Sequence, residues 1–268
     1  MPKVKDVKVK RKNKYPSKEP HPYAVALENK GPETQFTALL DQFNLSTNLE
    51  FEANLYTVLL NLSEGIRLNK VMRQWVLLNK DSIWINRSVT NAMHAVEAEH
   101  HLKKYEKSLD PVRLISAAEE MNLAGQHERA LELLKKHDEI GSNKNKKVAS
   151  FYFISYASTL VELRQFEDAK IMALSAYEQS KAEDVTCALL GVIHFHFGDV
   201  ETALNWFHQA EKNGMDPEYL VQYMRDSLKT VGSAKRYIVV KALLIKDPQK
   251  YSFVRGLLPK KQRGAVAA

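Results

Sequence analysis

Metal-ligating residue types gather in one short stretch, at His94, Glu97, His100 and His101. Glu97 and His100 match one Glu-x-x-His half of a di-iron carboxylate site, which needs a second such half on another helix. The rest of the sequence contains no second half. Ala98 occupies the position at which the inverted zinc motif His-x-x-Glu-His requires a histidine. We therefore predict no metal site and interpret the stretch as a polar helix surface.

Other catalytic motifs are also missing, because the sequence has no phosphate-binding loop, nucleophile elbow or dinucleotide-binding glycine motif. We expect a protein that is not an enzyme and holds no cofactor. The single cysteine, Cys187, excludes an intramolecular disulfide and falls inside an apolar helical pattern. The expectation that follows is a reducing, cytoplasmic location. No apolar run reaches the roughly 18 residues of a membrane span, so none is expected.

Basic residues concentrate at the two ends of the chain. The net charge is +7, of which residues 1–20 supply +6 and residues 255–263 supply +4, so the remainder carries −3. Like charges and prolines predict an extended arm over residues 1–35, and we expect a basic tail over residues 251–268. The arm is either a solubilising tail or a contact for a polyanion such as RNA, DNA or an acidic protein surface. The contact residues would be Lys8, Lys10, Arg11, Lys12 and Lys14.

A second basic group lies at Arg67, Lys70 and Arg73. Three-residue spacing would place these side chains on one helix face, where they could meet a phosphate backbone. A solvated helix face explains the same spacing. The group belongs to a helical front section that we expect over residues 36–109. Its helices are predicted at 49–62, at 66–78 and, capped by Asp81 or Ser82, from 83 onward.

Small residues recur at nearly constant spacing in the second half of the chain. In residues 184–217, two apolar helical segments flank the turn Gly198-Asp199, with small residues at Gly191, Ala203 and Ala210. Ala130, Ala169 and Ala203 follow one another at similar intervals, and the first interval is longer because it contains the polar loop 141–145. Together with Leu190 and Phe207, this pattern resembles the tetratricopeptide repeat, a helix-turn-helix unit of about 34 residues.

The resemblance implies an all-α fold, a right-handed α-α superhelix of helical hairpins over residues 110–217. Residues 218–250 would form either a degenerate repeat or a pair of capping helices. Positions eight and twenty of each unit hold Gly or Ala, because helices A and B approach closely there. Positions two, five, nine and twelve of helix A usually line a concave groove that holds a partner. Here the groove residues would include Ile115, Phe151, Ile154, Ser158, Val161, Val185, Ala188, Val192 and Phe195.

This lining is apolar for a surface that faces solvent, so we expect something to cover it. An external helix or extended segment, a second copy of the chain, and the chain's own front or C-terminal helices all remain possible. The expected function is a protein–protein interaction scaffold or adaptor within a multiprotein assembly, with a peptide or helix as the partner. The alternative is a nucleic-acid-associated protein whose basic arm contacts phosphates while the repeats recruit protein.

Overall fold

The computed structural model describes residues 49–80, 82 and 85–258, and every regular element within these ranges is a helix. This confirms the all-α prediction for the described part of the chain. The chain divides into two compact units, Met1–Met93 and His94–Ala268, and the boundary falls inside helix α5 (Arg87–Ser108). The sequence expectation of a boundary at residue 109 differs from this division. Within the described residues, no helix is both long enough and apolar enough to cross a bilayer.

The first unit contains α3 (Leu49–Ser63), α4 (Lys70–Leu78) and the start of α5. α3 ends where the sequence predicts, and Gly65 follows it with a positive φ of 65°. The other two boundaries differ from the prediction. α4 begins four residues late, because the Asn69 side chain accepts a hydrogen bond from Met72 N. Asn86, rather than Asp81 or Ser82, caps α5 by accepting from Ser88 N.

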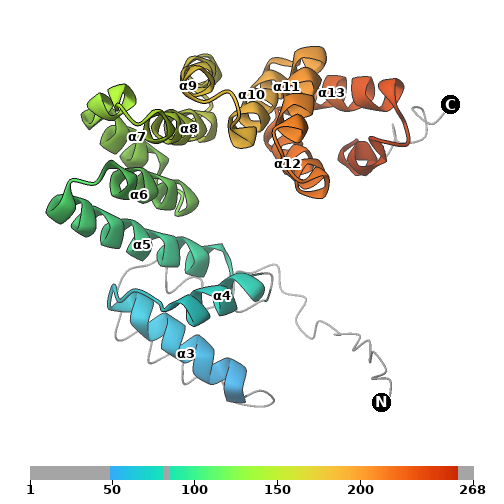
Figure 1. Ribbon diagram of the computed structural model, residues 1–268. Coiled ribbons are helices and arrows are strands. Elements are labelled where there is room, and N and C mark those ends of the chain that lie inside the picture. Colours follow the sequence, from blue (N-terminus) through green and yellow to red (C-terminus); the bar gives the residue numbers. More distant parts are fainter. Residues whose placement is uncertain (1–48, 81, 83–84, 259–268) are drawn as a thin grey trace, which may run out of the picture. The chain divides into compact units, whose positions relative to one another are not determined.

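The second unit is a succession of helical hairpins (Figure 1). The hairpins pair α6 with α7, α8 with α9, and α10 with α11, and neighbouring hairpins pack on each other in a way consistent with a helical repeat. The first hairpin starts at the Asp110-Pro111 pair, with the Asp110 carboxylate accepting from Val112 N. The bounds are α6 Pro111–Leu123, α7 His127–Lys136, α8 Lys146–Glu162, α9 Phe166–Gln179, α10 Asp184–Phe197 and α11 Val200–Lys212. A 3-10 turn, η1 (Asp138–Ser142), precedes α8.

Small side chains at the repeat positions are buried in the cores between helices, as the repeat spacing predicts. Ala130, Ala169 and Ala203 are each 0% exposed, and so are Ala118 and Ala157 at the earlier position in helix A. A larger side chain at any of them would overlap the facing helix, because protein interiors are close-packed.

Each hairpin turns through a residue with positive φ. Gly125 and Gly198 adopt φ values of 76° and 83°, and Arg164 takes the corresponding place with φ 59°. Glycine enters this left-handed region without steric cost, whereas arginine does so under strain. The second hairpin therefore has the same turn conformation as the other two, although an arginine disfavours a positive φ.

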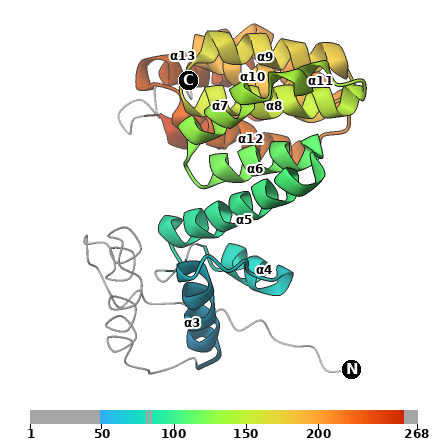
Figure 2. The same ribbon diagram turned by 90° about the vertical axis from the view of Figure 1, so that its left-hand side faces the viewer.

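The C-terminal elements are arranged differently from the hairpins. α12 (Pro217–Thr230) and α13 (Ser233–Lys246) pack chiefly on α10, and on the 3-10 turn η2 (Ser252–Leu257), rather than on each other. This favours a capping arrangement over another repeat of the same kind. The 3-10 turn η2 follows α13 at the C-terminal end of the described chain (Figures 1 and 2). Its Val254 and the preceding Tyr251, both expected in the basic tail, are 0% and 7% exposed and belong to the core. Residues 259–268 of that tail lie outside the described residues.

Candidate interaction surface

Helix α10 is enclosed by the rest of the second unit. Every residue from Thr186 to His196 is buried. Leu190 and Ile193 pack into the core that α8 and α9 share, while Val192 and Phe195 pack on the other side of the helix. A helix that is apolar all round requires such enclosure, because each exposed face would leave apolar area in water.

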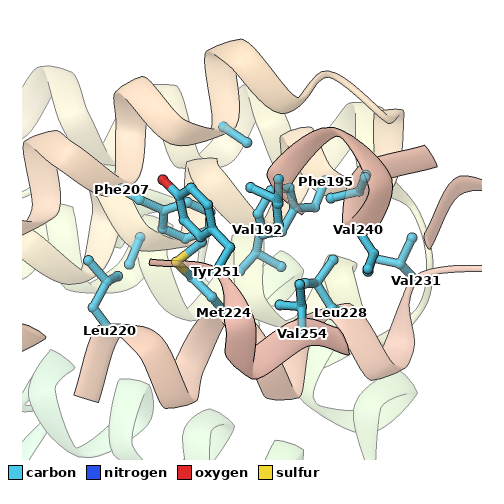
Figure 3. Packing of buried hydrophobic residues seen from close by; sticks show 14 of the residues in the cluster. Val192, Phe195, Phe207, Leu220, Met224, Leu228, Val231, Val240, Tyr251 and Val254 are labelled. Atoms are coloured by element: carbon cyan, nitrogen blue, oxygen red, sulfur yellow. The ribbon is translucent and has the colours of Figure 1, made fainter. Parts of the chain in front are cut away.

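The chain's own C-terminal helices cover part of the predicted groove. Ala188, Val192 and Phe195 are at most 4% exposed. They share one cluster with residues of α11, α12, α13 and η2 (Figure 3), namely Phe207, Leu220, Met224, Leu228, Val240, Tyr251 and Val254. Of the coverings that the sequence left open, the C-terminal helices occupy this part of the face, so these three side chains are not available to a partner in this structure.

The other predicted groove residues differ in exposure. Ile115 and Ile154 are core residues, at 4% and 9% exposed. Phe151 is half-buried and packs against the cores on both sides of α8. Ser158 and Val161 are also half-buried, and Val185 is 45% exposed. Only the half-buried and exposed members can contact another molecule without a rearrangement.

Partly exposed apolar side chains recur near the start of every second helix, on α6, α8, α10 and α12. Val112, Phe151 and Val185 follow one another at the same intervals as the buried alanines Ala130, Ala169 and Ala203, and Tyr219 continues the series. Val112, Val185 and Tyr219 lie in the first turn of α6, α10 and α12, with exposures of 43%, 45% and 59%. We call Val112, Phe151, Val185 and Tyr219 the position-two row. Tyr219 was not among the predicted groove residues, although it follows Val185 by the same interval at which Val185 follows Phe151.

Tyr219 stacks on Tyr223 one turn later, with ring centroids 6.2 Å apart. The pKa of Tyr223 is raised to about 12, first by burial and then by Tyr219 and the carboxylate of Glu162. Glu162 is the last residue of α8. The position-two row therefore ends in an aromatic pair, of which Tyr223 is influenced by the charge of this carboxylate.

The histidine-rich stretch lies on α5 and faces α6. His94 Nδ1 is 2.6 Å from Glu120 Oε2, and Glu97 is only 1% exposed. The interpretation of this stretch as a polar helix surface is wrong for these two residues, because their helix packs through Ala98 into the core around Leu114. Burial lowers the pKa of His101. Among the described residues, no three His, Cys, Asp or Glu side chains form a group that could hold a metal ion.

Two further histidines are buried near the end of α10. His194 Nδ1 is 3.2 Å from Asp199 Oδ2. His196 stacks on Phe166 at 4.0 Å, and its Nε2 is 3.3 Å from Thr230 Oγ1. Burial lowers the pKa of His196 to about 4, helped by the nearby cations Arg164 and Lys235. The neutral form of His196 therefore contacts Phe166 of α9 and Thr230 of α12.

The predicted polyanion contacts do not form one helix face in the described residues. Lys70 and Arg73 lie on α4, whereas Arg67 precedes its capping residue Asn69. The helix periodicity that grouped the three side chains therefore does not extend to Arg67. Lys8, Lys10, Arg11, Lys12 and Lys14 lie outside the described residues.

Comparison of the chain with protein-family models, with curated proteins and with solved structures gives no match.

Proposed function

We propose that this chain is a non-enzymatic scaffold or adaptor of the tetratricopeptide kind, a right-handed superhelix that holds a peptide or helix of a partner protein in a multiprotein assembly. The observation that carries the proposal is the position-two row. One partly exposed apolar side chain recurs in each of α6, α8, α10 and α12 with the period of the repeat itself. A segment lying across the helices would contact several of these side chains in turn.

The proposed groove consists of the part of the face that α12, α13 and η2 leave uncovered, extended by Tyr219 of α12 itself. Val112, Phe151, Val185 and Tyr219 would supply apolar contacts, and Ser158 would supply a polar one. Glu162, whose charge acts on Tyr223, would favour a basic residue in the partner. Interfaces of this kind depend on aromatic and apolar anchors, so we expect Tyr219 to contribute most.

The test is retention of partner proteins by the purified full chain, measured by mass spectrometry with and without nuclease. Val185→Glu and Tyr219→Glu should each lose the same set of proteins, while both variants keep the helical circular dichroism spectrum. Val221→Glu is the matched control, because Val221 is 39% exposed on α12 but lies outside the row. Phe195→Glu is unsuitable, since it would bury a charge in the core. Retention unchanged in both row variants would rule out the groove.

A nucleic-acid-associated protein is the second candidate function. The observation in its favour is the charge of residues 1–20, which contain eight Lys or Arg residues and only two acidic ones. In this proposal the arm contacts phosphates and the repeats recruit protein. Binding of the arm to nucleic-acid phosphates should then weaken as salt is added. Capture of a partner protein at the position-two row should instead persist after nuclease treatment.

A further inference from the structure

The outer face of α13 combines exposed isoleucines with lysines. Ile238 and Ile245 are 57% and 68% exposed, although they belong to a helix whose opposite face is core. Lys235 and Lys246 lie at the two ends of this face, about three helical turns apart, and Lys241 lies between the isoleucines. We call these five residues the α13 stripe.

The outer face of α9 has the same length and the opposite charge. Ile171 and Leu174 are 56% and 36% exposed. Glu167 and Glu178 are exposed at the two ends, and their separation in sequence equals that of Lys235 and Lys246. We call these four residues the α9 stripe.

The end charges of both stripes are unpaired within the part of the chain that the structure describes. No ion pair among the described residues engages the end lysines of the α13 stripe or the end glutamates of the α9 stripe. α13 carries four basic residues and no acidic one, and the only cation of α9, Lys170, lies over the ring of Phe197. α9 and α13 each pack on α10 and stand apart in Figure 1, so the stripes do not meet within one copy.

We propose that the α13 stripe of one copy of this chain docks on the α9 stripe of a second copy, joining copies head to tail. The isoleucines of α13 would pack on Ile171 and Leu174, while the end lysines meet the end glutamates. This surface is separate from the position-two row. Two α13 stripes would repel each other, and so would two α9 stripes, which disfavours a symmetric pair. The basic ends of the chain have the same sign as α13 and are excluded as its occupant by the same reasoning.

Such a contact uses a different surface on each copy. Each pair therefore leaves one free α9 stripe and one free α13 stripe, from which a chain or a closed ring can grow. A single helix-on-helix contact lies at the small end of interface sizes. The association should consequently be weak, increase with protein concentration and weaken as salt screens the end charges.

Sedimentation velocity of the full chain over a wide concentration range tests the proposal. The wild type should form larger species as concentration rises. Ile238→Glu and Ile171→Lys should each weaken association about tenfold or more, because each places a charge in the apolar centre of the contact. Both positions are exposed, so the circular dichroism spectrum should not change. Val221→Glu, outside both stripes, is the control and should associate like the wild type.

Mixing the two variants distinguishes a head-to-tail contact from every symmetric one. The Ile238→Glu chain keeps its α9 stripe and the Ile171→Lys chain keeps its α13 stripe, so an equimolar mixture should form a dimer that grows no further. A mixture that stays monomeric, or a wild type that is monomeric throughout, overturns the proposal. Binding of the wild type to phosphatidylserine vesicles that is lost in Ile238→Glu, without self-association, would also overturn it and assign the α13 stripe to a membrane surface.

Discussion

Gly191 in α10 lies directly against the ring of Phe207 in α11. A Cβ atom built on Gly191 would be 2.7 Å from both Cε1 and Cζ of that ring, closer than real side chains approach. Phe207 is 2% exposed and cannot move aside without disturbing the core. The contact explains why the hairpin has a glycine here. Any side chain at position 191 would occupy the space that the Phe207 ring fills.

Gly191→Ala should therefore destabilise the protein by about 1–3 kcal/mol, as overpacking of a core does. Gly232→Ala is the matched control, because nothing lies within 4 Å of a Cβ there and its φ is −55°. The control should change the stability less than Gly191→Ala does, because it meets no steric overlap and only the N-cap preference for glycine opposes the gain in chain entropy. Chemical denaturation of the two variants measures the difference. Phe207→Leu in the Gly191→Ala background should recover part of the loss, and independent effects of the two changes would contradict the contact.

Arg164→Gly should not destabilise the protein, even though it removes a charged side chain. Arg164 occupies the left-handed turn position that Gly125 and Gly198 fill in the neighbouring hairpins. Relief of strain and the greater chain entropy of glycine oppose each other, so we expect a net gain between zero and about 1 kcal/mol. Gly198→Ala should instead lose about 1 kcal/mol. Thermal denaturation of both variants checks the opposite signs, and a loss in Arg164→Gly would show that the turn is not strained.

Acidification should destabilise the protein through His196. Its pKa is about 4 in the folded protein against 6.5 for the free side chain, so the unfolded chain binds more protons between these values. The contribution of neutral His196 to the free energy of unfolding is complete above about pH 6.5 and decreases as the pH drops toward 4. It amounts to at most about 3 kcal/mol. His196→Gln should flatten the dependence of the unfolding free energy on pH across this window. Parallel curves for the wild type and the variant would exclude His196 as the cause.

The same titration provides a test of the cations around His196. Arg164→Gly removes a positive charge that lowers the pKa of this imidazole. The pKa of His196 should therefore rise in that variant, as measured by the chemical shift of its ring protons. Lys229→Gln, which removes a cation paired with Asp226 instead, should leave the pKa unchanged.

Deletion of residues 1–20 should change the salt dependence of RNA or DNA binding if the second candidate function holds. Each phosphate contact releases counterions, so affinity should fall steeply with salt in the full chain and less steeply after the deletion. Filter binding at several salt concentrations measures the slope. Absence of binding at low salt would remove this candidate.

Local signals in the sequence identified some helix ends. The end of α3 before Gly65 and the turn at Gly198-Asp199 both involve residues within a few positions of the end itself. The predicted start of α5 was wrong because Ser82 and Asn86 both have side chains that can cap a helix. The Ser82 hydroxyl accepts a hydrogen bond from Ile85 N, but the helix begins only after Asn86. Propensity alone does not choose between neighbouring caps.

The sequence by itself determined the hairpins. Small residues that recur at nearly constant spacing mark the close helix contacts, since only Gly and Ala fit there. Only the tertiary structure decided which residues cover the apolar helix faces between these contacts. Periodicity shows that Phe195 is on an apolar face, but Tyr251 and Val254, far along the chain, are among the residues that cover it. Hydrophobic burial has no directional or sequence-distance preference, so the partner of an apolar face emerges only when the chain is folded.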